Sequence, residues 1–321
     1  MEKLKIGIVG AAGYAGGELI RLLLHHPKAE IDFVLSNSQN GKKVSEVHTD
    51  LNGETDLVFT QSLKESAQVI FLALPHGRSE QFLQENKIAD EVLVIDLSTD
   101  FRDEKEDFVY GLTEVFPDKI KSSKRIANPG CFATAIQLAL APAVAQSWTK
   151  QSIHVSGITG STGAGVIPSD TTHFSWRNQN VSSYKLFEHQ HLHEVKQTFT
   201  QLDSNFKEEI LFVPYRGNFS RGILTTVYFP FEGKLDDAKK EFKDYYKSSA
   251  FVHVSDDIID LKQVVNTNKC LLHLEVKSDQ LIITSIIDNL LKGAAGQAVQ
   301  NMNLHLGWEE NLGLQLKANA Y

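Results

Sequence analysis

The sequence predicts an α/β protein in which a doubly wound parallel sheet precedes an α+β domain with a mixed sheet. Short, apolar, strand-like runs alternate with helical patterns over the first 100 residues, which is typical of buried parallel strands and their connecting helices. A glycine-rich turn joins the first strand to the first helix, and longer strand-like runs follow after residue 150.

The first half of the chain contains four expected strands. The apolar run 5–10 is the first strand, and the amphipathic segment 16–27 is a helix that ends at its proline. The other strands, each ended by turn residues, are expected at 31–37, 69–75 and 91–98. An alanine-rich helix then begins at Cys131, because Pro129 and Gly130 interrupt any preceding strand.

The second half is expected to be α+β. Its strands are predicted at 152–161, 209–217, 223–231, 270–278 and 280–288. A helix over 236–251 lies among them, and the segment 289–308 returns to helix after a glycine-rich turn. We therefore expect one domain formed by residues 1–130 and 290–321, and a second formed by residues 131–289.

Length, charge and cysteine content limit the class of protein. The 321 residues suggest two domains, and 42% hydrophobic with 22% charged residues is an ordinary globular composition. A net charge of −8 disfavours nucleic acid and anionic membrane surfaces as partners. No apolar run approaches a membrane span, and the start passes directly into a strand, which leaves no room for a secretory signal. With only two cysteines, we expect a cytoplasmic protein with free thiols.

Cys131 follows Asn-Pro-Gly at the start of the alanine-rich helix. A thiol at a helix N-terminus lies near unpaired backbone N–H groups and the positive end of the helix dipole, which stabilise a thiolate. Cys131 is therefore a candidate nucleophile, and the alternative is a small buried residue that only packs. Cys270 lies in a strand-like run and is expected to pack.

Gly10, Gly13 and Gly16 form a G-x-x-G-x-x-G pattern between the first strand and the first helix. Glycines at this point permit a tight turn and a close approach of backbone to a pyrophosphate, which predicts a dinucleotide site. At the end of the second strand, Ser36 and Ser38 lie near two lysines and no carboxylate, which favours the 2′-phosphate of NADP over NAD. The alternative is a solvated loop with surface lysines.

A second glycine-rich loop spans residues 157–165. It cannot be a Walker loop, because the Gly-Lys-Ser/Thr ending is missing. Two interpretations are open. In the first, its consecutive N–H groups and the hydroxyls of Ser161 and Thr162 form an anion nest. In the second, the loop is only a flexible turn.

His189, His191, His193 and Glu194 lie within six residues of one another. Three interpretations compete: alternating histidines on a strand bind zinc with Glu194, one histidine is the acid–base partner of Cys131, or the cluster is a polar surface. The nucleophile favours the second interpretation, because a thiolate needs a proton donor and acceptor, whereas a zinc centre has no evident task.

Arg216 and Arg221 lie beside glycines at a strand boundary. The planar fork of an arginine suits a carboxylate or a phosphate substrate. Exposed arginines are common, so neither is identified by sequence alone. Arg221, immediately before an apolar strand, is the better fixed of the two.

Taken together, the sequence resembles the N-acetyl-γ-glutamyl-phosphate reductase family of arginine biosynthesis, a relative of aspartate-semialdehyde dehydrogenase. The resemblance runs essentially end to end, and its segments are VGAAGYAGGEL, GKKVSEVHTDLNG, FLALPHG, DLSTDFR, YGLTEVF, ANPGCFATA, GSTGAG, RGILTTVY and DNLLKGAAGQAVQNMN. It implies a Rossmann-like NADP-binding domain, an α+β catalytic domain of semialdehyde dehydrogenase type, and a homodimer or homotetramer assembled through the mixed sheet.

The family's His-Arg-His-x-Pro-Glu motif is present here as HQHLHE. His189, His191 and Glu194 match the motif, whereas Gln190 and His193 stand where the family has arginine and proline. We therefore expect His191 to be the acid–base catalyst and His189 to support it.

The resemblance also implies the chemistry and the remaining site residues. Cys131 attacks an acyl phosphate, the resulting thioester is reduced by NADPH, and an aldehyde is released. The expected substrate-binding residues are Arg221, Ser161, Thr162, Gly163 and Glu194. The expected NADP(H)-binding residues are Gly10, Ala12, Gly13, Tyr14, Ala15, Gly16, Ser36, Ser38, Pro75, Gly293 and Asn301. No metal is expected.

Several alternatives stay open at this point. Val166 follows the second glycine loop, where the family commonly has a basic residue. This departure leaves the acyl group of the substrate open among acetyl, succinyl, aminoadipyl and carrier-linked. Aspartate-semialdehyde dehydrogenase is the nearest rival activity. An NADP-binding regulator is the non-enzyme alternative, and it predicts an unreactive Cys131.

Overall fold

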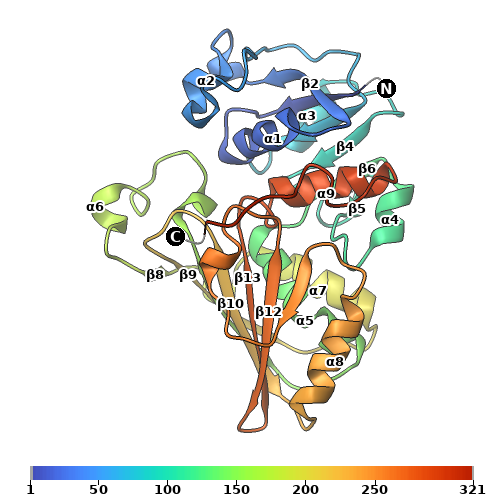
Figure 1. The fold of residues 1–321 in the computed structure, drawn as a ribbon, viewed down its shortest axis with the longest axis vertical. Helices are drawn as coiled ribbons and strands as arrows, with labels where there is room; N and C mark the ends of the chain where they lie inside the picture. The colour runs from blue at the N-terminus through green and yellow to red at the C-terminus, as the bar shows by residue number, and fades with distance from the viewer. Residues whose placement is uncertain (1–2, 320–321) are drawn as a thin grey trace. The chain divides into compact units, whose positions relative to one another are not determined.

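The computed structural model describes residues 3–319, which form two compact units (Figure 1). The first unit contains residues 3–129 together with Ala294–Gln315. The second contains Gly130–Gly293 and residues 316–319. Each unit has its own sheet, so the predicted α/β fold class is confirmed.

The first unit is built on a six-stranded sheet with the order β2-β1-β3-β4-β6-β5, and all of its strand pairs are parallel. Its strands are β1 (Leu4–Val9), β2 (Ala29–Leu35), β3 (Val69–Leu72), β4 (Leu93–Asp96), β5 (Val109–Tyr110) and β6 (Arg125–Ala127). Its α-helices are α1 (Tyr14–Leu24), α2 (Val44–Val47), α3 (Ser79–Glu85), α4 (Pro117–Ser122) and α9 (Ala295–His305). The four strands and the first helix predicted from the sequence are all present.

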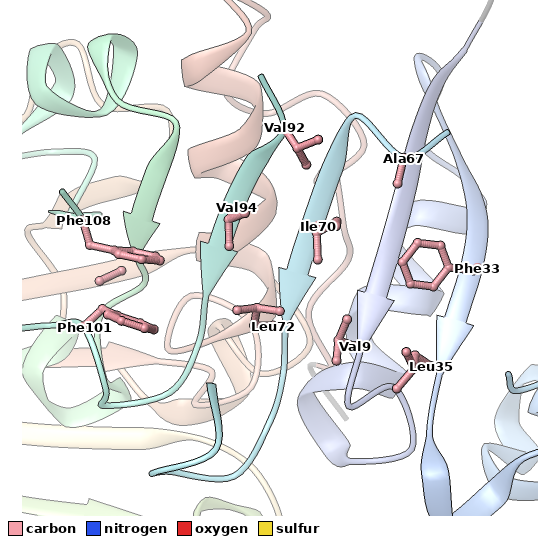
Figure 2. Close-up of a cluster of buried hydrophobic side chains, with 11 residues drawn as sticks. Val9, Phe33, Leu35, Ala67, Ile70, Leu72, Val92, Val94, Phe101 and Phe108 are labelled. Carbon is pink, nitrogen blue, oxygen red and sulfur yellow. The ribbon is translucent and has the colours of Figure 1, made fainter. Parts of the chain in front are cut away.

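Apolar side chains from the strands form the core of the first unit. Figure 2 shows that Val9, Ile70 and their neighbours gather on one face of the sheet. Phe101 and Phe108 stack within this cluster, with ring centroids 4.1 Å apart, and Phe82 of α3 packs against it. Parallel sheets are covered on both faces, which explains why their strands are continuous apolar runs in the sequence.

The second unit is built on a seven-stranded mixed sheet with the order β11-β12-β13-β10-β7-β9-β8. Its strands are β7 (Ile153–Thr159), β8 (Ser182–Ser183), β9 (Ile210–Arg216), β10 (Ile223–Pro230), β11 (Val252–Ser255), β12 (Cys270–Lys277) and β13 (Gln280–Ile287). The last described residues lie with this unit, because the N–H of Asn319 donates to the carbonyl of Val265 at 3.1 Å. The sequence had assigned them to the first domain.

The helices of the second unit are α5 (Cys131–Ala145), α6 (Phe174–Arg177), α7 (His191–Leu202) and α8 (Leu235–Tyr245). Helices α5, α7 and α8 lie along one side of the sheet in Figure 1. Burial alternates along β7 and β10, as expected for strands with one face against helices. On the opposite face, His154 and Tyr228 stack with ring centroids 4.9 Å apart. Across residues 3–319, no helix is both long and apolar enough to span a bilayer.

Asp96, at the end of β4, is a fully buried carboxyl group in the first unit. Ser98 Oγ donates to its Oδ2 at 2.7 Å. Burial raises the pKa of Asp96 to about 6, although hydrogen bonds and the charge of Arg102 oppose the increase. Because the folded state holds this proton more tightly than the unfolded state, the residue's contribution to stability falls as pH rises from about 4 to about 6.

We expect the unfolding free energy of Asp96→Asn to increase relative to that of the wild type as pH rises. Between pH 4.5 and 7.5, the difference in unfolding free energy is expected to change by about 2 kcal/mol in favour of the variant, or about 4–8 °C in melting temperature. Thermal unfolding followed by circular dichroism at several pH values measures this difference. Asp118→Asn is the control, since the Asp118 side chain is 96% exposed. Melting curves of Asp96→Asn and wild type that shift in parallel with pH would contradict the prediction.

Candidate active site

Cys131 is the first residue of α5 and is partly exposed. The side chains from Phe132 to Val144 are all buried, so the helix that carries the thiol is held firmly in the second unit. Gly130 at the N-cap contributes no capping side chain. The first-turn N–H groups and the helix dipole therefore lie close to the sulfur, where they stabilise a thiolate. This environment suits a nucleophile.

Glu194 connects the start of α5 to a histidine. It is 4% exposed, and its Oε2 accepts a hydrogen bond from the N–H of Gly130 at 2.9 Å. Its Oε1 lies 3.9 Å from Nε2 of His191, one turn away on α7. Glu194 therefore holds the residue before the nucleophile and faces the predicted acid–base group. Its predicted contact with substrate stays a prediction.

His189 is buried immediately before α7. The N–H of His191 donates to Nδ1 of His189 at 3.2 Å, which leaves the ring proton on Nε2. Burial lowers the pKa of His189 to about 4, and the charges of Lys185 and Arg216 act in the same direction. His189 is therefore a neutral hydrogen-bond acceptor near pH 7, which agrees with a supporting role beside His191.

The three histidines do not converge. Helix α7 begins at His191, so the zinc interpretation, which required alternating histidines on a strand, is wrong. His193 is exposed, whereas His189 and His191 are buried. Within the described part of the chain, no group of three or more His, Cys, Asp or Glu side chains is placed to hold a metal ion.

The glycine-rich turn that follows β13 passes directly against Cys131. A Cβ atom on Gly293 would lie 2.7 Å from Cβ of Cys131 and 2.6 Å from the carbonyl oxygen of Asn289. Both separations are shorter than any stable carbon contact, so only glycine fits this position without a shift of its neighbours. The cofactor contact expected for Gly293 stays a prediction.

We expect Gly293→Ala to push Cys131 out of position. The value of kcat/KM for acyl-phosphate reduction is expected to fall by about 10- to 100-fold, because small misplacements of a reacting group are costly. The rate at which Cys131 is alkylated is also expected to differ from the wild-type rate. Steady-state kinetics measure the first effect, and an iodoacetamide time course measures the second. The melting temperature distinguishes displacement from unfolding. A folded variant with wild-type kinetics and alkylation would contradict the steric argument.

The loop after β7 forms a short 3-10 turn, Ser161–Ala164. The N–H groups of Ser161, Thr162 and Gly163 already donate to backbone carbonyls, at 2.8, 3.1 and 3.3 Å respectively. The interpretation of this loop as an anion nest is therefore wrong. Thr162 Oγ1 donates to the carbonyl of Ser220 at 2.6 Å and accepts from Nδ2 of Asn289 at 3.0 Å. The predicted substrate contacts of Ser161, Thr162 and Gly163 stay predictions.

Arg221 is engaged by a carboxylate of its own unit. Its Nε and Nη2 donate to Oδ2 and Oδ1 of Asp288, at 3.0 and 3.1 Å, and Asp288 is fully buried. Asp288 also accepts from the N–H groups of Leu290 and Leu291. The pair therefore braces the turn that leads to Gly293, and the predicted substrate contact of Arg221 stays a prediction.

Sequence reasoning missed Tyr184 and ranked Arg216 below Arg221. The guanidinium of Arg216 lies over the Tyr184 ring, 4.8 Å from its centroid. Burial raises the pKa of Tyr184 to about 12, and the negative charge of Cys131 adds to the increase, whereas Arg216 opposes it. Both residues therefore share the environment of the nucleophile. The only sequence signal was the position of Arg216 beside a glycine at the end of a strand.

The glycine-rich turn of the predicted dinucleotide site lies in the first unit. Its strand order reverses between β1 and β3, and ligands of doubly wound sheets bind beyond the carboxyl ends at such a point. Gly10 has φ +77°, and a Cβ there would lie 2.5 Å from the carbonyl oxygen of Ala73. A Cβ on Gly16 would lie 2.6 Å from Cα of Ala11. Gly13, the N-cap of α1, leaves the helix N-terminus without a side-chain cap, so the turn fits a pyrophosphate.

The remaining predicted cofactor residues are distributed over the first unit. Ala12, Tyr14, Ala15 and the exposed Pro75 belong to the segments that follow β1 and β3. Ser36 Oγ lies 3.4 Å from Ser38 Oγ after β2. Asn301 is buried in α9, and its Nδ2 donates to the carbonyl of Gly111 at 2.9 Å and to Oδ1 of Asn128 at 3.1 Å. Contacts of these residues with a cofactor stay predictions.

Two family models match the chain. The semialdehyde dehydrogenase NAD binding domain matches residues 5–123, and the semialdehyde dehydrogenase dimerisation domain matches residues 131–289. Among solved structures, an aspartate semialdehyde dehydrogenase II from Vibrio cholerae complexed with ASA has a TM-score of 0.75 at 18% identity, over 96% of this chain and 99% of that one. An aspartate semialdehyde dehydrogenase with NADP from Candida albicans has a TM-score of 0.70 at 14% identity, over 97% and 100%. These likenesses show the fold.

Curated relatives are far closer in sequence. The N-acetyl-gamma-glutamyl-phosphate reductase of Christiangramia forsetii is 53% identical over 320 residues, which cover 99% of this chain and 100% of the relative. The protein of the same name from Phocaeicola vulgatus is 51% identical over 321 residues, with the same coverage. The similarity therefore includes both units and the segments between them.

Proposed function

The chain belongs to the family of N-acetyl-γ-glutamyl-phosphate reductases and is an oxidoreductase that uses a nicotinamide cofactor, and from this premise we propose how its residues act. The proposed reaction is the NADPH-dependent reduction of N-acetyl-γ-glutamyl phosphate to the semialdehyde and phosphate, in arginine biosynthesis. The observation that carries the proposal is the partly exposed Cys131 at the start of α5, where Glu194 accepts from the N–H of the preceding Gly130 and faces His191.

The Cys131 thiolate attacks the acyl carbon of the substrate. A C–S bond forms, the C–O bond to phosphate breaks, and phosphate leaves with the bonding electron pair. The first-turn N–H groups of α5 stabilise the oxyanion that develops on the acyl oxygen. The product of this half-reaction is a thioester on Cys131.

When bound, the reduced nicotinamide supplies the hydride that converts the thioester carbon to the aldehyde level. His191 donates a proton to the oxygen of the resulting hemithioacetal and recovers it as the C–S bond breaks. Glu194 positions His191, and the neutral His189 accepts the N–H of residue 191. The thiolate is regenerated at the end of the cycle.

NADPH is proposed as the cofactor because the segment after β2 offers the hydroxyls of Ser36 and Ser38 and no carboxylate. The glycine turn after β1 supports the pyrophosphate. A homodimer or homotetramer is proposed on the match to a dimerisation domain, through the sheet face that carries His154 and Tyr228. Both cysteines are free thiols, which supports a cytoplasmic location.

The test is the reverse reaction with a panel of aldehydes. Phosphate-dependent reduction of NADP⁺ is measured with N-acetylglutamate semialdehyde, its N-succinyl and aminoadipyl analogues, and aspartate semialdehyde. We expect the N-acetyl compound to have the highest kcat/KM, and NADP⁺ to exceed NAD⁺ by at least about tenfold. A preference for aspartate semialdehyde or for another acyl group would replace the proposed substrate. Absence of turnover with every aldehyde would leave the regulator alternative.

A further inference from the structure

Two arginines lie together at the carboxyl end of β9. Nη1 of Arg177 donates to the carbonyl oxygen of Arg216 at 2.6 Å. Burial lowers the pKa of Arg177, and the positive charge of Arg216 lowers it further. Two neighbouring cations repel each other, so this arrangement costs stability unless a negative group completes it.

Among residues 3–319, neither arginine forms an ion pair with a carboxylate. Arg177 is 5% exposed, and its guanidinium donates to the carbonyls of Thr171 and Asn180 and to Ser182 Oγ. Arg216 stacks on Tyr184, and its buried Nε has no hydrogen-bond partner. Buried donors in folded proteins are nearly always paired, so an unpaired guanidinium N–H points to an acceptor that binds from outside the chain.

Arg216 is also close to the catalytic groups of the second unit. The positive charge of Arg216 acts to lower the pKa of both Tyr184 and His189. The negative charge of Cys131 acts to raise the pKa of Tyr184. The ring of His189 lies 5.7 Å from that of Tyr184 and 5.6 Å from that of Phe132, the residue after the nucleophile. The unpaired donor therefore belongs to the same cluster as the thiol.

The topology explains why Arg216 lies at this place. Strands β7 and β9 are parallel, with Arg216 opposite Thr159, so the ends of both strands meet at one edge of the sheet. Ser182 of β8 pairs with Arg216 from the other side. The backbone of Arg216 is therefore fixed on both sides, which preorganises its side chain for binding.

We propose that Arg216 binds an anionic group of the acyl-phosphate substrate, a carboxylate or the phosphate, and that Arg177 holds Arg216 in place from behind. This inference rests on the proposed function for the identity of the substrate. Arg216 fits the role better than Arg221, because the charge of Arg221 is already compensated by Asp288. A planar guanidinium binds either anion through two parallel hydrogen bonds.

The first experiment needs no turnover. Alkylation of Cys131 by iodoacetamide is timed with the full-length protein, in the presence of increasing inorganic phosphate and, separately, of N-acetylglutamate. We expect one of the two anions to slow alkylation of the wild type, and Arg216→Leu to raise its half-protecting concentration at least about tenfold. Arg216→Lys, which keeps the charge and loses the planar fork, is expected to lie between them. Lys185→Met is the matched control, since it removes an exposed cation near the same histidine.

The second experiment identifies the anion through the reverse reaction. A KM increase for phosphate in Arg216→Leu assigns the phosphate, and an increase for the semialdehyde assigns the carboxylate. The KM for NADP⁺ is expected to stay within about twofold of the wild type, because the change is confined to one substrate group. Circular dichroism and melting temperature verify that the variant is folded.

The outcomes separate this inference from the proposed reaction. If neither anion protects the wild-type thiol, or if Arg216→Leu and Lys185→Met behave alike, the anion site is refuted whatever the turnover. If protection depends on Arg216 but no aldehyde on the panel is oxidised, the site stands and the proposed reaction fails. Unchanged KM values for both phosphate and semialdehyde in an active Arg216→Leu would also refute the inference.

Discussion

Replacing Cys131 with serine is expected to lower kcat for acyl-phosphate reduction by at least about 10,000-fold, because the covalent intermediate is lost. Serine keeps the shape of the side chain but is scarcely ionised at neutral pH, so it is a far weaker nucleophile than the Cys131 thiolate. The reaction then lacks the thioester that divides displacement and reduction into two steps.

The measurement pairs kinetics with mass spectrometry. Wild-type protein mixed with substrate in the absence of NADPH is expected to gain the mass of one acyl group, and Cys131→Ser is not. NADPH affinity is expected to be unchanged, since the proposed pyrophosphate site lies in the other unit of the chain. Cys270→Ser is the control, because Cys270 is fully buried in β12 beside Ser285. Full turnover in Cys131→Ser would remove the covalent mechanism.

The fold was predictable because its signals are local. The four predicted parallel strands are short apolar runs, and two of the helices follow start signals, the glycines before α1 and Pro129 before α5. The nucleophile was predictable for the same reason: Cys131 needs only its position at a helix N-terminus. The sequence analysis placed residues 316–319 in the first domain, whereas in the structure Asn319 donates to Val265 of the second unit, a contact between distant positions.

The rest of the site depends on contacts between distant residues. The pairing of Arg221 with Asp288 joins positions 67 residues apart, and it braces the turn that leads to Gly293. The contact of Glu194 with Gly130 spans 64 residues. No local pattern predicts which of two arginines five residues apart pairs with a carboxylate, so the proposed role of Arg216 required the three-dimensional structure.

Replacing His191 with asparagine is expected to lower kcat by about 100- to 10,000-fold, the usual contribution of a positioned general acid–base group. The pH profile of kcat is expected to lose one limb, because the group that exchanges the proton is gone. Asparagine is chosen for its similar size and polarity at a position that is 7% exposed. Steady-state rates across pH 5.5–9, with melting temperature as a check on folding, provide the measurement.

His189→Asn is the matched comparison, since it lies two residues away and is equally buried. Burial lowers the pKa of His189 to about 4, so it stays neutral throughout that pH range and exchanges no proton there. The asparagine Oδ1 replaces Nδ1 as acceptor for the N–H of His191, so kcat is expected to fall by less than about tenfold and to keep both limbs of its pH profile. If His189→Asn is the more damaging change and removes the limb, the proton is exchanged by His189 and the roles of the two histidines are reversed.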